Sequence, residues 1–127
     1  MSINNINKME NGVAVKSYSF AIKTVKIYKF LNEYKKEFVL SKQLLRSGTA
    51  IGALIKEAEQ AQSKADFLNK MNIALKEANE TEYWLMLLRD TEYLEEKMHN
   101  DINADCTELL RMLISIVKTT KVNLNRK

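Results

Sequence analysis

The sequence predicts an all-α protein, an up-down-up-down antiparallel four-helix bundle, from three observations. The 127 residues contain no proline and only three glycines, so the chain lacks the residues that turns between strands require. Apolar residues recur at steps of three and four along four stretches of about 20 residues each. The connections between these stretches are short, which favours antiparallel neighbours.

The first helix is predicted to follow a flexible arm. Residues 1–14 are polar, rich in asparagine and without apolar periodicity, which is typical of a mobile chain end. Ser17 or Ser19 could cap the helix that follows, which should end within residues 35–37. Its apolar stripe consists of Phe20, Thr24, Ile27, Leu31 and Tyr34.

The second helix should run from near Ser41 to about Gln62, and it contains two glycines in mid-run. Its stripe consists of Leu44, Gly48, Ile51, Ile55 and Ala58. Glycine inside a helix costs about 1 kcal/mol relative to alanine, so Gly48 and Gly52 need a packing reason. A phosphate-binding loop places its glycines ahead of a helix and after a strand, and this segment does neither. We interpret the pair as a flat surface for another backbone, either within the bundle or between subunits.

The third and fourth helices continue the pattern. Ser63 and Asp66 have the spacing of a capping box that starts the third helix. The third stripe consists of Phe67, Met71, Ala74, Ala78, Thr81, Leu85 and Leu88. The fourth consists of Ile102, Cys106, Leu109, Leu113 and Ile116, with Leu110, Ile114 and Val117 on the adjoining face. The bundle should therefore span residues 15–121, followed by a basic tail over 122–127.

A charged seam is predicted beside the glycines. On the second helix, Arg46 and Glu57 bracket a run of small residues, and on the third helix Glu77 and Glu82 lie near Trp84. An arginine bound to a carboxylate could fix the register of two helices at a partly buried seam. The alternative is that these are exposed surface charges. The candidate residues for helix packing or an oligomer seam are Arg46, Gly48, Gly52, Glu57, Glu77, Glu82 and Trp84.

Charge is distributed unevenly along the chain, whose total is +4. Residues 1–42 carry +5, residues 91–110 carry −5 and residues 111–127 carry +5. The start of the first helix and the end of the fourth lie at the same end of an antiparallel bundle, so their bases could combine to bind a polyanion. The alternative is that these lysines only maintain solubility. The candidate nucleic-acid-binding residues are Lys16, Lys23, Lys26, Lys29, Lys118, Lys121, Arg126 and Lys127. No aromatic residue stands out as exposed, so we expect no platform for stacking unpaired bases.

The residue types that carry catalysis are scarce. Cys106 is the only cysteine and has apolar helical neighbours, so we interpret it as a core residue in a reducing, cytoplasmic protein. His99 is the only histidine and lies in the least regular segment, so we expect it to be a solvated surface residue. Together they support no catalytic site, metal site or cofactor. The N-terminus lacks the pattern of a signal peptide, and no segment has the apolar length of a membrane span.

Three blocks resemble a known family: "EFVLSKQLLRSGTAIGALIKEA", "KADFLNKMNIALKEANETEYWLMLL" and "LLRMLISIVKTTK". They are similar to the bacterial four-helix bundle family named for the 23S rRNA intervening-sequence protein. The resemblance implies a homopentameric ring with no established enzymatic activity. More distantly, the chain is similar to the accessory variability proteins of diversity-generating retroelements, which are basic pentamers that bind nucleic acid and a reverse transcriptase.

From the residues and the resemblance together, we expect a non-enzymatic, cytoplasmic homo-oligomer that binds RNA or DNA through its basic surfaces. The resemblance implies that this oligomer is a pentamer. The alternative is a structural or adaptor ring that binds another protein, such as a reverse transcriptase.

Overall fold

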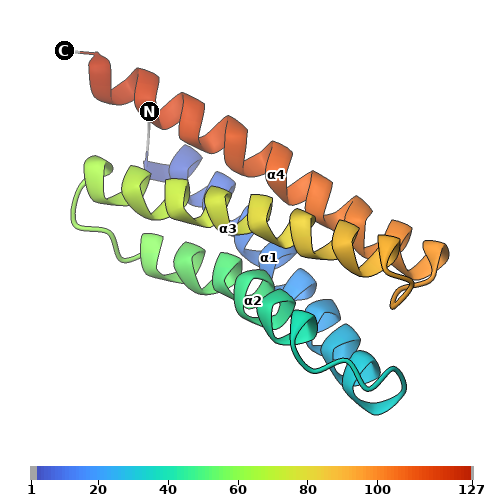
Figure 1. Cartoon of the computed structure of the whole chain (residues 1–127). Coiled ribbons are helices and arrows are strands. Elements are labelled where there is room, and N and C mark those ends of the chain that lie inside the picture. Colours follow the sequence, from blue (N-terminus) through green and yellow to red (C-terminus); the bar gives the residue numbers. More distant parts are fainter. Residues whose placement is uncertain (1–2, 127) are drawn as a thin grey trace.

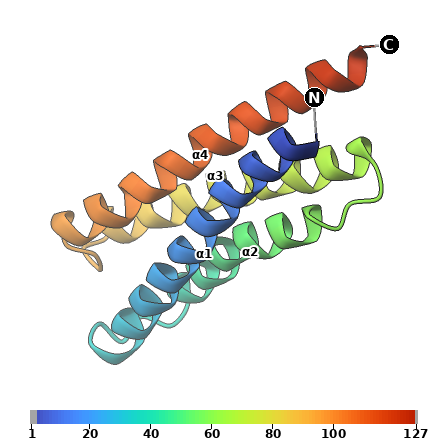
Figure 2. The same ribbon diagram turned by 180° about the vertical axis from the view of Figure 1, so that it is seen from behind.

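Four antiparallel helices make up the structure, a computed structural model that describes the backbone of residues 3–126 and the side chains from Gly12 onward. The helices are α1 (Ile3–Glu33), α2 (Leu40–Ala58), α3 (Lys64–Asp90) and α4 (Glu96–Asn125), and residues 3–126 contain no strand. Helix α1 packs against α2 and α4, and α3 packs against the same two helices, which closes the bundle (Figure 1). The view from behind in Figure 2 shows the start of α1 and the end of α4 at the same end of the molecule. No helix in the described part of the chain is long and apolar enough to cross a bilayer.

The predicted apolar stripes form the core almost throughout. In α3, for example, Met71, Ala74, Ala78, Leu85 and Leu88 are fully buried, and Phe67 packs against the edge of the core. Leu110 and Val117 on the adjoining face of α4 are also buried, whereas Ile114 is exposed. Burial of such side chains contributes roughly 1.5–3 kcal/mol each and is the main term that holds the bundle together.

The first helix begins earlier than predicted. Helix α1 starts at Ile3 instead of near Ser17 or Ser19, so most of the predicted arm over residues 1–14 is helical. Val13 is fully buried seven residues before Phe20, and it therefore extends the stripe by two turns. The hydroxyl of Ser17 donates to the carbonyl of Ala14 at 2.9 Å, so this serine lies inside the helix and does not cap it.

Other predicted boundaries shift as well. Helix α1 ends at Glu33, which leaves Tyr34 beyond the helix and 73% exposed instead of in the core stripe. Helix α2 ends at Ala58 instead of Gln62. Helix α4 continues to Asn125, because Thr120 is still buried against the bundle, so most of the predicted tail is helical.

Glu37 caps the start of α2 through its side chain. Its buried carboxylate accepts hydrogen bonds from the backbone N–H groups of Val39, Leu40 and Ser41 at 3.2, 3.0 and 2.7 Å. Burial alone would raise the pKa of Glu37, but these backbone donors outweigh it and hold the pKa below its ordinary value. The carboxylate thus satisfies N–H groups that lack a partner inside the helix.

The two ends of α3 have defined caps. The side chain of Ser63 accepts from the N–H of Asp66 at 3.0 Å, which confirms the predicted capping residue. At the other end, Tyr93 N donates to the carbonyl of Leu88 and Glu92 N donates to the carbonyl of Arg89, the bonding pattern of a Schellman motif. Glu92 occupies the left-handed position of this motif, with φ of 69°.

Gly48 provides the close helix contact that its position predicts. A Cβ atom on Gly48 would lie 2.7 Å from Cγ2 of Thr24 on α1, closer than real side chains approach. A Cβ on Gly52 would lie 3.4 Å from the hydroxyl of Ser17, which leaves almost normal van der Waals space. The close-packing interpretation is therefore confirmed for Gly48, within the bundle. At Gly52 a Cβ would lie 3.5 Å from the carbonyl oxygen of Ser17, so the α1 backbone comes near but a methyl group would still fit.

Candidate functional site

Two of the predicted nucleic-acid-binding residues form ion pairs between helices of the bundle. Lys16 forms ion pairs with Asp105 at 2.8 Å and with Glu108 at 2.9 Å, both on α4. Lys23 pairs with Asp105 at 2.5 Å and with Asp101 at 3.4 Å. Hydrogen bonds to Asp105 raise the pKa of both lysines. Burial acts to raise the pKa of Asp105, but the hydrogen bonds from the two lysines lower it overall. Lys16 and Lys23 thus join α1 to α4 instead of facing a ligand.

The sequence contained a signal for this pairing. The acidic segment 91–110 forms the start of α4, and in an antiparallel bundle it must lie against the middle of α1, whose lysines supply the opposite charge. The sequence analysis assigns four lysines of the first helix to a nucleic-acid ligand, and the structure shows that Lys16 and Lys23 are instead engaged in ion pairs with acids of α4.

Lys26 and Lys29 remain available on α1. Both side chains are exposed, and neither forms an ion pair with the described residues. Because Lys23 already contacts Asp101 near the start of α4, Lys26 and Lys29 lie toward the end of the bundle that carries the α1–α2 connection. They belong to the outer surface of the molecule.

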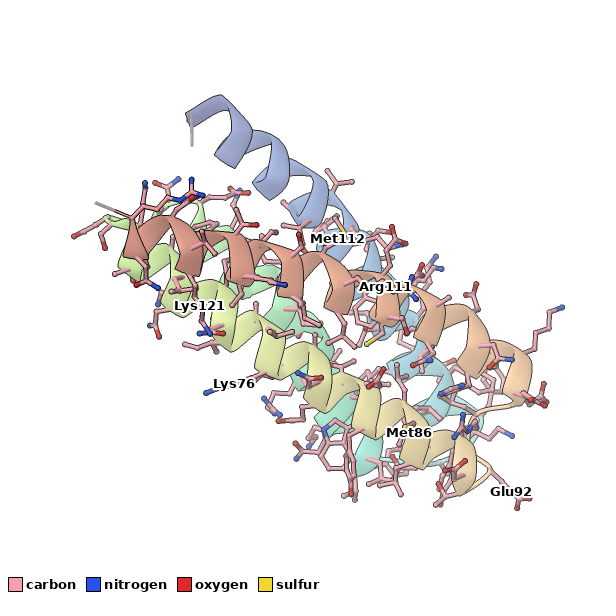
Figure 3. The ribbon with its side chains drawn as sticks, turned by 90° about the horizontal axis from the view of Figure 1, so that it is seen from above. Lys76, Met86, Glu92, Arg111, Met112 and Lys121 are labelled. Atoms are coloured by element: carbon pink, nitrogen blue, oxygen red, sulfur yellow. The ribbon has the colours of Figure 1, made fainter. Side chains whose placement is uncertain are left out.

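A second basic group lies near the end of α4 and consists of Lys118, Lys121 and Arg126, all exposed and without an ion pair among the described residues. Lys118 follows Asp105 by thirteen residues, which is about 20 Å along a helix. The two basic groups are therefore far apart, and the prediction that they combine is wrong. Figure 3 shows Lys121 near the C-terminal end of α4, and Glu92 at the opposite end of the bundle. Lys127 lies outside the described residues.

Arg46 joins α2 to α3, as the seam prediction required, but with a different second partner. Its guanidinium bonds Glu77 at 3.1 Å and also binds Glu80, which in turn accepts from the indole N–H of Trp84 at 3.0 Å. Glu80 is one turn from Glu77 and shares its face, whereas the charge of Glu82 acts on Cys106 of α4. The partner that Arg46 takes beside Glu77 is therefore Glu80 and not the predicted Glu82.

Glu57, the other predicted seam residue of α2, pairs with Lys70 of α3 at 3.6 Å. The ion pairs of Arg46 and Glu57 lie at the molecular surface, where each contributes at most about 1 kcal/mol. They fix the register of α2 against α3 and form no reactive centre.

The histidine and the cysteine of the chain are both buried. His99 is only 2% exposed, so its prediction as a solvated residue is wrong; it lies seven residues before Cys106 and extends the core stripe of α4. Burial and then the charge of Glu82 raise the pKa of the Cys106 thiol to about 12, so the thiol stays protonated near neutral pH. Its sulfur lies 3.6 Å from the carbonyl of Ala78, in the core as predicted. Within the described residues, no three His, Cys, Asp or Glu side chains gather to hold a metal ion.

An apolar groove runs along the outer face of α1 and α2. It has a volume of about 660 Å³, and its lining includes Ala14, Val15, Tyr18, Gly52 and Ala53. Tyr18 is 70% exposed at its edge. Gly52 and Ala53 make the floor of the groove low, which is the structural result of the small residues on α2. Exposed apolar surface of this kind is common at protein–protein contacts.

The sequence analysis also missed exposed aromatic residues. Tyr34 and Phe38 both lie in the α1–α2 connection with most of their surface in solvent, contrary to the expectation that no aromatic ring is available. The misplaced end of α1 explains the error for Tyr34, which had been assigned to the core stripe.

These features define a class: a compact four-helix bundle whose accessible features are basic groups and an apolar groove. The chain belongs to the family of the 23S rRNA-intervening sequence protein, whose model matches residues 9–115. It is similar to the crystal structure of a protein of unknown function from the S23 ribosomal protein family of Bacteroides thetaiotaomicron VPI-5482. The two chains are 62% identical, with a TM-score of 0.85 over 87% of this chain and 98% of the other. None of the curated proteins matches the chain.

Proposed function

We propose that this protein is a non-enzymatic, cytoplasmic homo-oligomer, pentameric as its family resemblance implies. We propose that it binds RNA or DNA through lysine and arginine side chains that form no ion pair within the described part of the protein. The observation that carries this proposal is the division of its cations into two kinds. Lys16 and Lys23 are neutralised by acids of α4, whereas Lys26, Lys29 and the basic group near the end of α4 are exposed and form no ion pair with any residue that the structure describes. Unpaired surface cations release counterions from a phosphate backbone, which favours binding without sequence preference.

Self-association is supported by the groove between α1 and α2. The exposed apolar side chains at its edge, Val15 and Tyr18, would lose their contact with water in an assembly. In a ring, the outward lysines of each subunit would be repeated around the axis, and the repeated charges would strengthen the attraction for a polyanion.

The proposal is tested by fluorescence anisotropy with a labelled RNA and a labelled DNA duplex. We expect Lys26→Glu/Lys29→Glu to weaken binding at least tenfold, because two attractive charges become repulsive. The matched control is Lys97→Glu, which reverses an exposed lysine in the acidic first turns of α4 and should change affinity little. The pair Lys16 and Lys23 is unsuitable for this test, since their loss would unpair Asp105 and disturb the fold.

A second candidate function is that of an adaptor that binds another protein in the apolar groove. The groove itself favours this candidate, because it offers an unfilled apolar surface. The absence of any nucleic-acid binding, even at low salt, would contradict the first proposal and favour the adaptor.

A further inference from the structure

The connection between α1 and α2 carries two exposed aromatic rings together with several exposed lysines. We call residues 34–42 the tip. Tyr34 is 73% exposed, Phe38 55% and Val39 71%, although all three are large hydrophobic residues. The tip also carries Lys35, Lys36 and Lys42, which are exposed and form no ion pair with the described residues.

The only acid of the tip is directed inward. The carboxylate of Glu37 is buried and accepts three backbone N–H groups at the start of α2, so it does not lie among the exposed lysines. The nearest exposed acid is Glu33, the last residue of α1, so three exposed lysines of the tip stand against one exposed carboxylate. Lysines that served only solubility would not require that Glu37, the neighbouring acid, be turned inward.

The tip is also held in one conformation. The hydroxyl of Ser41 donates to the carbonyl of Glu37 at 2.8 Å, and the side-chain amide of Asn32 donates to the Ser41 hydroxyl at 3.3 Å. The ring of Tyr34 packs against Phe30, with ring centroids 5.6 Å apart. Exposed rings on a fixed backbone lose little conformational freedom when they bind.

Rings and lysines in this combination match an unpaired nucleic-acid strand. Each base of a single strand exposes a face that can stack on an aromatic ring, and each phosphate can contact a lysine. A duplex hides its base faces, so it can use only the lysines. Lys29 lies one helical turn before the tip, and Lys26 lies about one turn further, so the basic surface continues from the rings along α1.

We propose that the tip binds single-stranded RNA or DNA, with Tyr34 and Phe38 stacking on bases and Lys35, Lys36 and Lys42 contacting phosphates. This inference rests on the proposed function, since it names the form of nucleic acid that the protein selects and the rings that select it.

The experiment is an anisotropy titration in which the full-length protein is added to one of two labelled probes, a short oligouridine or an RNA duplex. Base stacking contributes about 1–3 kcal/mol per base, so Tyr34→Ala and Phe38→Ala should each weaken oligouridine binding roughly 5- to 140-fold. Duplex binding should stay within about twofold of wild type. Tyr83→Ala, which removes an exposed ring on α3, is the matched control and should affect neither probe.

A second variant separates charge from stacking. The triple variant Lys35→Gln/Lys36→Gln/Lys42→Gln should bind both probes more weakly. Its plot of log affinity against log salt concentration for oligouridine should be shallower by about two units of slope. Thermal melting of Phe38→Ala and of the lysine variant should match wild type, because these side chains are exposed; Tyr34→Ala loses only its contact with Phe30 and should remain folded.

Four results would overturn the inference alone. Equal losses for both probes in the ring variants would show that the rings do not read unpaired bases. Binding of the tip to vesicles containing anionic lipid, with loss in Phe38→Ala but no loss of oligouridine affinity, would assign the tip to a membrane surface. A drop in oligomer mass in Phe38→Ala, with oligouridine affinity unchanged, would assign the tip to a contact between copies.

If neither probe binds the wild-type protein at low salt, the proposed function itself fails. If both probes bind and the ring variants behave as wild type, only this inference fails.

Discussion

Gly48 and Gly52 occupy the same helix four residues apart, yet their surroundings differ. Gly48 faces the branched side chain of Thr24, whose hydroxyl is held by the carbonyl of Phe20 at 2.9 Å and cannot easily move. Gly52 faces the groove and meets only Ser17 at ordinary contact distance. A helix-favouring substitution should therefore have opposite effects at the two positions.

We predict that Gly48→Ala lowers the free energy of unfolding by about 1–3 kcal/mol, because the overpacked methyl outweighs the gain in helix propensity. Gly52→Ala should raise it by up to about 1 kcal/mol. Denaturant melts of the two variants provide the comparison. The double variant Gly48→Ala/Thr24→Ala should recover part of the loss, since it removes the two nearest atoms; a loss equal to or greater than the sum of the single changes would contradict this account.

Glu92 offers a second test at the scale of one residue. A side chain in the left-handed conformation costs about 1–2 kcal/mol relative to an ordinary φ, and glycine avoids this cost. Glu92→Gly should thus stabilise the protein by about 0.5–1 kcal/mol, after the greater chain entropy of glycine is deducted. Calorimetry should show a higher Tm. Glu95→Gly, at a residue whose φ is −65°, is the control and should show no gain.

Among the helices, α2 depends on a carboxylate that precedes it. The folded-state pKa of Glu37 lies below its ordinary value of 4.5, so its stabilising effect is fully present above pH 4.5 and is lost as the pH falls through the folded-state pKa. The lowered pKa of Asp105, between α1 and α4, acts in the same direction. Both groups should therefore make the bundle less stable in acid.

For Glu37→Gln we expect a loss of about 1–2 kcal/mol at neutral pH, because the amide is a weaker acceptor for three N–H groups. Melts recorded from pH 7 to about pH 3 should show the gap between variant and wild type closing below pH 4.5. A gap that stays constant with pH would mean that the carboxylate charge is not what stabilises α2.

How far the sequence predicts each element depends on the kind of signal. Periodicity located all four helices and nearly all of the core, because burial of a stripe such as Met71–Leu88 is repeated every turn. Helix ends were less predictable, since Val13 lies in an asparagine-rich segment with few apolar residues. Tyr34 continues the stripe in sequence although the helix has already ended. Ion-pair partners were least predictable: the choice between Glu80 and Glu82 for Arg46 depends on helix rotation, which the pattern defines only coarsely.

At the scale of the whole molecule, the bundle presents different surfaces on different sides. The α1–α2 face carries the apolar groove, and the bases lie at two separate ends. We expect Tyr18→Glu to reduce the oligomer mass measured by sedimentation, because it places a charge at the edge of the groove. An assembly of unchanged mass would exclude this face as the contact between copies. Lys76→Glu, on an exposed residue of α3, is the control (Figure 3).

The lysine and arginine side chains are likewise divided into those that form ion pairs within the bundle and those that face solvent. Only the solvent-facing side chains can bind a polyanion. The affinity for RNA measured across a salt series tests this division most directly. Wild-type binding should weaken linearly on a log–log plot with a slope of about −2 or steeper. Lys26→Gln/Lys29→Gln should make the slope shallower by about 1.5, and Lys97→Gln should leave it unchanged. A wild-type affinity that does not depend on salt, or no binding at low salt, would contradict the proposal that these lysines bind nucleic acid.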